Sequence, residues 1–315
     1  MNFKGTTATA AALVLALAIQ TGSGVAEAAK TPSATLTQTP QLSAEMKHAN
    51  AIYTHTLQLL KQNKLAEAVS YMEKYISGVT LQQATIMTLK LENAQLAARP
   101  AWNKKIISEA NQRALMKLAT DKYDLTFLMN RTKDKKLRTL LQGARDSGYQ
   151  LQTSEGMFYL VMDYPRYQKF RSFVTADIKS YIDIMTTETN KPFSNDAALM
   201  ISWSEVTNRA LTQQKFVKSF PVSNRAKQVQ SLYNNYLNIT FTGLNNTPLF
   251  DYEHNKMDAM AKAAYQKVLD NNSIDNNSYL KKLQGFLDVL AKNNDMLTPE
   301  VEKYSKSVLP KQMKY

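Results

Sequence analysis

Cysteine is absent from this chain of 315 residues, and glycine, histidine and tryptophan are scarce. Without cysteine the protein has no disulfide, no thiolate nucleophile and no N-terminal cysteine that could be acylated. The nine glycines are scattered, so no glycine-rich phosphate loop is present and nucleotide binding has no support. Neither a G-x-S-x-G elbow nor an S-x-x-K motif in a suitable context occurs, which argues against serine hydrolases and transpeptidases.

The three histidines, His48, His55 and His254, do not form a metal motif. His48 and His55 are seven residues apart, about 10 Å along a helix, so they cannot share one ion. Neither lies in an H-E-x-x-H arrangement. We therefore expect solvent-facing histidines, and neither a metal nor another cofactor.

The N-terminus predicts a cleavable secretory signal peptide over residues 1–28. Lys4 precedes an apolar run at 10–19, and Ala26-Glu27-Ala28 forms an A-x-A cleavage site. The run is about a dozen residues, whereas a permanent span needs about 20. We expect cleavage after Ala28, no permanent membrane span afterwards, and a protein that is secreted or associated with the cell wall. An uncleaved anchor is the alternative.

The chain carries a large excess of positive charge. Lys and Arg number 39 against 26 Asp and Glu, a formal net charge of +13. Such a field attracts polyanions, including anionic lipid and the phosphate-bearing polymers of a Gram-positive wall. No nucleic-acid partner is expected outside the cytoplasmic membrane. The alternative is that lysines spread over solvated helix faces only confer solubility.

Apolar residues recur at intervals of three and four along most of the chain, which predicts an all-α fold arranged as an irregular helical bundle or an α-solenoid. We expect a flexible linker at 29–42, an N-terminal helical region at 43–148, a central helical region at 149–242 and a C-terminal helical region at 243–315. One predicted helix, 80–98, stops before Pro100, and the next begins near Asn103. The segment 149–163 departs from this rhythm, and a turn at Glu155-Gly156 before a β-prone run predicts a short hairpin there.

Aromatic residues cluster around this segment. Eight of the 29 aromatics fall between Tyr149 and Tyr181, interleaved with basic residues. Tyrosine rings beside cations suit stacking on sugars or anchoring of a partner protein. The proposed binding residues are Tyr164, Arg166, Tyr167, Lys169 and Arg171, of which Tyr164, Arg166 and Tyr167 are expected to be exposed. Packing of a hairpin against helices would produce the same pattern.

Paired carboxylates provide the only route to catalysis that the composition leaves open, because such pairs depend on spatial separation. The candidates lie around the hairpin and on the helices that follow: Glu155, Asp163, Glu188, Asp196 and Glu205. Carboxylates at such places are more often helix caps or solvated partners of lysine.

Two segments resemble the tetratricopeptide family. Tyr53, Leu60, the turn at Asn63-Lys64 and the run Leu65-Ala66-Glu67-Ala68 resemble one helix pair in which a small Ala lets the helices approach closely. Phe216 followed by the segment 220–226 is similar to the junction "aromatic, Pro, x, Ser, x, x, Ala" of extracytoplasmic tetratricopeptide-like proteins. The resemblance covers about 50 residues without a regular 34-residue period. It implies a helical solenoid whose groove holds a protein or peptide.

The whole chain also resembles exported proteins of spore-forming Gram-positive bacteria. Together these features predict an exported, non-enzymatic binding or scaffold protein of the cell envelope, whose partner is another protein or an anionic wall polymer. A hydrolase that cleaves wall glycan or peptide with paired carboxylates is the alternative. An extracytoplasmic solute-binding protein is disfavoured because strands and helices do not alternate.

Overall fold

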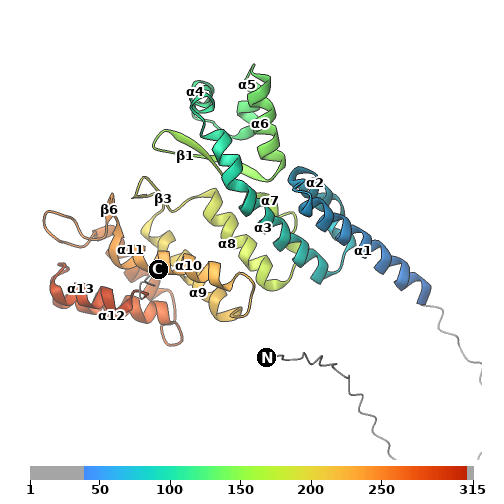
Figure 1. Ribbon diagram of the computed structural model, residues 1–315. Helices are drawn as coiled ribbons and strands as arrows, with labels where there is room; N and C mark the ends of the chain where they lie inside the picture. The colour runs from blue at the N-terminus through green and yellow to red at the C-terminus, as the bar shows by residue number, and fades with distance from the viewer. Residues whose placement is uncertain (1–38, 311–315) are drawn as a thin grey trace, which may run out of the picture.

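Residues 39–310, the part of the chain that the computed structural model describes, contain thirteen α-helices and three antiparallel two-stranded hairpins (Figure 1). The mostly helical bundle with a short hairpin is therefore confirmed. The predicted signal peptide and most of the predicted linker lie outside the described residues. The first helix already begins at Thr39, so the expectation of a linker up to residue 42 is wrong. Pro40 suits this position because the first turn of a helix requires no amide donor.

The first half of the described chain contains eight helices and the longest hairpin. In order these are α1 (Thr39–Lys61), α2 (Leu65–Tyr75), α3 (Leu81–Ile106), α4 (Glu109–Leu118), α5 (Leu125–Arg131), α6 (Lys135–Asp146), β1 (Tyr149–Ser154), β2 (Met157–Met162), α7 (Tyr164–Tyr167) and α8 (Ala176–Asn190). Short 3-10 turns occupy Ile76–Gly78 and Arg171–Phe173.

The second half has five helices and two very short hairpins. In order these are β3 (Ser194–Asn195), β4 (Ala198–Leu199), α9 (Trp203–Ser219), α10 (Ala226–Thr242), β5 (Gly243–Leu244), β6 (Thr247–Pro248), α11 (Ala259–Asp270), α12 (Ser278–Lys292) and α13 (Pro299–Val308). None of the helices between residues 39 and 310 is both long enough and apolar enough to span a bilayer.

Helix α3 differs from its prediction. It continues through Pro100 to Ile106 instead of stopping at residue 98, and the next helix, α4, starts only at Glu109. Pro100 lies on the exposed side of α3, so the carbonyl of Leu96 that it leaves without a helical amide partner can be hydrated. A proline that faces solvent therefore does not have to end a helix.

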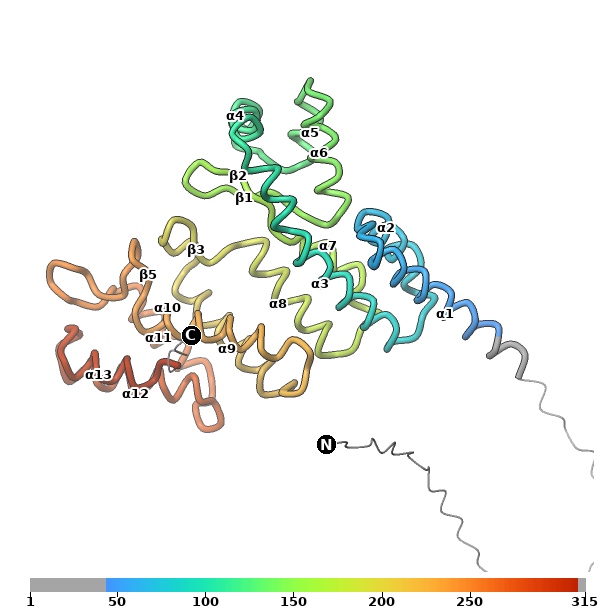
Figure 2. Tube along the Cα trace, viewed as in Figure 1, coloured from blue at the N-terminus to red at the C-terminus, as the bar shows by residue number. Residues whose placement is uncertain are grey.

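The apolar side chains form two buried clusters. The first gathers residues of α1 to α8 and the β1–β2 hairpin, together with Phe216 of α9 and Val229 of α10. The second gathers residues from Ile201 to Val308. Figure 2 shows the blue-to-green part of the chain beside the orange-to-red part, with α8 between them. Helices α9 and α10 contribute to both clusters and so join the two halves. The segment at 243–248 forms the short β5–β6 hairpin beside the second cluster.

The predicted hairpin at 149–163 is confirmed. Its strands pair from Tyr149 with Met162 to Ser154 with Met157. The two-residue turn has φ +50° at Glu155 and +75° at Gly156, the left-handed geometry that a tight hairpin turn requires. Successive side chains point to opposite faces, and one face of the hairpin is buried: Tyr149, Leu151, Phe158, Leu160 and Met162.

Candidate functional site

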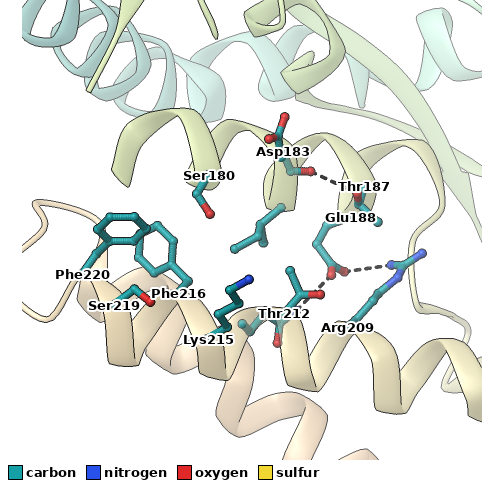
Figure 3. Close-up of a pocket in the computed structure, with 12 residues that line it drawn as sticks. Ser180, Asp183, Thr187, Glu188, Arg209, Thr212, Lys215, Phe216, Ser219 and Phe220 are labelled. Atoms are coloured by element: carbon teal, nitrogen blue, oxygen red, sulfur yellow. Dashed lines mark hydrogen bonds and ion pairs between the residues drawn. The ribbon is translucent and has the colours of Figure 1, made fainter. Parts of the chain in front are cut away.

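A cavity of about 500 Å³ lies between α8 and α9, where the two clusters meet. Figure 3 shows its lining: Phe216 and Phe220 at one end, and Glu188 and Arg209 at the other. Lys215, an exposed residue of α9, extends its side chain into the same space. The cavity therefore offers an aromatic end and a charged end.

The Glu188 carboxylate accepts three hydrogen bonds at the charged end of this cavity. The donors are the Tyr236 hydroxyl at 2.7 Å, Arg209 Nη1 at 3.2 Å and Gln213 Nε2 at 3.1 Å. Burial raises the pKa of Glu188, and the hydrogen bonds from Tyr236 and Arg209 only partly offset that effect. Gln213 is buried, and its Oε1 accepts no hydrogen bond within residues 39–310.

The charges at this end are paired with one another. Arg209 also binds Glu205, one helical turn before it, and donates to the backbone oxygen of Lys191 at 2.9 Å. The Lys191 ammonium lies 2.6 Å from Glu205. Because each cation contacts a carboxylate, the cluster ties α8 and the segment after it to α9, and Glu188 and Glu205 share Arg209 instead of facing an open cleft.

Tyr164 and Tyr167, expected at the surface, are buried at 5% and 3% exposure, so that expectation is wrong. They lie three residues apart on α7, so both face the same way. The Tyr164 hydroxyl donates to Glu92 at 2.6 Å, and the Tyr167 hydroxyl donates to Gln95 Oε1. Both acceptors are on α3, more than 70 residues earlier, so no local pattern marks these tyrosines as core residues.

The three basic members of the predicted set are divided between two carboxylates. Arg166 and Lys169 contact Glu73 of α2 at 2.5 and 2.9 Å. Arg166 is mostly covered, with a side chain 22% exposed, and Lys169 is exposed. Arg171 instead binds Asp183 of α8 with two hydrogen bonds of 2.6 and 2.7 Å, at the rim of the α8–α9 cavity. The structure therefore does not bring the five residues together in one exposed patch.

The five carboxylates proposed for hydrolysis have separate roles. Asp163 caps α7 by accepting from the amide of Arg166, and Glu188 and Glu205 are paired with Arg209. Glu155 and Asp196 lie in exposed turns with positive φ. These positions serve backbone turns, helix starts and ion pairs.

The histidines also lie apart. His55 packs its ring 4.5 Å from that of Tyr71, and His254 approaches Asp251 at 3.2 Å in an exposed turn. Across the described chain, no group of three or more His, Asp and Glu side chains is placed to hold a metal ion.

Positive charge is concentrated at one end of the molecule. Residues 99–138 hold eleven Lys and Arg against four Asp and Glu. Nine of these cations are exposed and form no ion pair with any residue between 39 and 310. Arg138 donates to the carbonyls of Met129 and Thr132, and Lys122 borders a separate cleft beside β1. The other seven are Lys104, Lys105, Lys117, Arg131, Lys133, Lys135 and Lys136. We call this set the basic end. Its carriers, the last turn of α3, then α4, α5 and the start of α6, gather at the top of Figure 1. In the sequence, the basic end is indicated only by the excess of Lys and Arg over Asp and Glu in residues 99–138.

Comparison with known protein families, with curated proteins and with solved structures finds no significant match for this chain.

Proposed function

We propose that the chain is exported and cleaved after Ala28, and that the mature protein is a non-enzymatic binding protein of the cell envelope that holds an anionic wall polymer at the basic end. The observation that carries this proposal is the group of seven exposed cations without ion pairs at one end of the molecule. Elsewhere the buried charges are paired, as in the Glu188–Arg209 cluster.

The start of α6 strengthens the argument. Lys135 and Lys136 occupy its first turn, where the helix dipole disfavours cations. Asp134, the N-cap, uses its carboxylate to accept from the amides of Lys136 and Leu137. An anion beside this turn would interact favourably with both lysines and the helix terminus. Phosphate groups of a wall polymer have the required charge.

Co-sedimentation of residues 29–315 with purified Gram-positive wall material, across a salt series, tests the proposal. Screening by salt limits the range of attraction between exposed charges to about 8 Å at physiological ionic strength, and this range shortens as salt is added. The amount of protein retained on the walls should therefore fall steeply as the salt concentration rises. Walls stripped of their phosphate polymer should retain little protein.

A matched pair of triple variants separates a local site from overall charge. Lys133→Gln with Lys135→Gln and Lys136→Gln should lower the affinity for intact walls at least tenfold, since each lysine near an anionic surface contributes about 1 kcal/mol. Lys267→Gln with Lys281→Gln and Lys292→Gln removes the same charge from exposed positions on α11 and α12 and should change it less than about twofold. Equal losses would show that no local site exists. Release of soluble sugar or peptide from the walls would favour the hydrolase instead.

A further inference from the structure

The two edges of the β1–β2 hairpin differ in whether their outward amide and carbonyl groups form hydrogen bonds. In this register alternate residues of β2, namely Phe158, Leu160 and Met162, point their amide and carbonyl groups away from β1. The Gln112 side chain accepts from the Phe158 amide at 2.8 Å and donates to the Phe158 carbonyl at 2.9 Å. Asn103 does the same for Leu160, at 2.7 and 3.1 Å.

These two side chains therefore stand where a third strand would lie. A carboxamide presents one acceptor and a neighbouring donor, as a backbone peptide group does. Asn103 at the end of α3 and Gln112 on α4 serve alternate residues of β2, which is the spacing at which a neighbouring strand would pair. The edge of β2 is therefore closed to a further strand over Phe158 and Leu160.

The edge of β1 is open by the same criterion. Leu151 and Thr153 lie directly opposite Leu160 and Phe158, so their amide and carbonyl groups also point outward, on the other side of the hairpin. Within residues 39–310 no side chain or backbone group forms a hydrogen bond with these four groups. Unpaired peptide groups of this kind favour a partner that supplies matching donors and acceptors.

The open edge borders a cleft of about 770 Å³. All five residues from Tyr149 to Thr153 line it, and the facing wall comes from the end of α8 and the segment through β3. The Gln152 side chain reaches across to the Thr189 carbonyl at 3.4 Å. The cleft thus follows β1 over nearly its whole length.

The charge of the cleft distinguishes it from the basic end. Its charged residues balance, three acidic and three basic: Asp121, Lys122, Asp124, Arg145, Asp163 and Lys191. Arg145 and Lys191 are paired with Asp146 and Glu205, which do not line the cleft, so Lys122 is its one lining cation without an ion pair among residues 39–310. A cleft without excess positive charge beside unpaired backbone offers nothing special to a polyanion and suits an uncharged peptide, which brings no carboxylate beside Asp121, Asp124 and Asp163.

We propose that an extended, uncharged segment of a partner polypeptide binds in this cleft and adds to β1 as a third strand, with hydrogen bonds to the amides and carbonyls of Leu151 and Thr153. The segment before Thr39 is a poorer occupant, because α1 begins at the side of the molecule away from the hairpin (Figure 1). This inference does not depend on the basic end.

Selection from a phage-displayed library of random linear dodecapeptides on immobilised protein of residues 29–315 tests the proposal. Synthetic copies of the enriched peptides should slow amide hydrogen exchange of Leu151 and Thr153 at least tenfold. Exchange at Gln150 and Gln152, whose amides already pair with β2, should change little.

Thr153→Pro removes one outward amide without removing a β1–β2 ladder bond, and an edge strand tolerates proline there. It should weaken peptide binding about tenfold, the effect of losing one backbone hydrogen bond. Thr153→Ala keeps the amide and should bind within about twofold of the parent protein. Unchanged exchange at Gln150 and Gln152 in both variants confirms that the hairpin is intact.

Three results would overturn the proposal. These are a library from which no peptide is enriched, enriched peptides that leave Leu151 and Thr153 unprotected, and equal binding by the proline and alanine variants. Strong protection of both amides before any peptide is added would show that the chain itself or a second copy already fills the edge, and would also overturn it.

Discussion

The guanidinium of Arg225 lies 2.7 Å from the carboxylate of Glu92, a residue 133 positions earlier in the chain. Both side chains are buried, and the second oxygen of Glu92 accepts from the hydroxyls of Tyr164 and Tyr181. Arg225 immediately precedes α10, so the pair ties α3 in the first half to the start of a helix that packs in the second. The two halves of the molecule are joined through this contact as well as through apolar packing.

Arg225→Met should lower the free energy of unfolding by about 3–5 kcal/mol, because it leaves the Glu92 carboxylate buried without a cation. Urea unfolding followed by circular dichroism measures the change. The double variant Glu92→Gln with Arg225→Met should lose less than the single variant, since glutamine removes the charge and still accepts from the tyrosines. A loss below about 1 kcal/mol in the single variant would show that the pair is dispensable.

The Glu73 cluster predicts a pH dependence. Burial by itself raises the pKa of Glu73, but the hydrogen bonds from Arg166 and Lys169 outweigh it and hold the pKa below the ordinary value of 4.5. Because the folded pKa lies below the unfolded one, the cluster stabilises the protein above about pH 4.5, and this contribution is lost as the pH falls through the folded pKa. Arg166→Met should lower stability at neutral pH by about 1–3 kcal/mol and flatten the decline between about pH 5 and pH 3.

Lys169→Gln is the control for Arg166→Met, because it removes a cation from the same carboxylate at an exposed position. It should cost less than about 0.5 kcal/mol. Parallel acid titrations of the two variants and the parent protein test the distinction, and equal losses would contradict a structural role for Arg166.

Gln112→Leu should destabilise the protein by about 1–3 kcal/mol, because the amide and carbonyl of Phe158 lose their partners where water has little access. Amide hydrogen exchange at Phe158 should speed up in the same variant. Asn111→Ala, which removes a hydrogen bond to the Lys105 carbonyl near the surface, should cost less and leave Phe158 unchanged. An unaltered exchange rate at Phe158 in Gln112→Leu would refute the role of this side chain as a substitute strand.

Gly148→Ala should cost about 2–4 kcal/mol of stability. Gly148 has φ +85°, and a Cβ there would lie 2.1 Å from Nε2 of Gln95, which is buried and donates to the Ser147 carbonyl at 2.7 Å. Gly156→Ala has a similar φ of +75° but meets no atom closer than 3.9 Å, so only the backbone cost of about 1–2 kcal/mol applies. Thermal unfolding of both variants measures the difference, and equal losses would show that the contact with Gln95 adds nothing.

The helices and the longest hairpin could be predicted because their signals are local. Periodicity of three and four residues places apolar side chains on one helical face, and the turn at Glu155-Gly156 before a β-prone run marks a tight hairpin. Local reasoning was wrong at Pro100, where the effect of the proline depends on whether its side of α3 faces solvent. It also placed the end of the linker too late, since α1 begins at Thr39.

The sequence by itself determined the net charge, the absence of cysteine chemistry and the mostly helical class, because these follow from composition and short-range pattern. Only the tertiary structure decided that Tyr164 and Tyr167 are core residues, since their partners Glu92 and Gln95 come from a distant helix. The same holds for the closed edge of β2 and the open edge of β1, which depend on where α3 and α4 bring Asn103 and Gln112. Burial and pairing are properties of segments far apart in sequence, and no local pattern encodes which of them will meet.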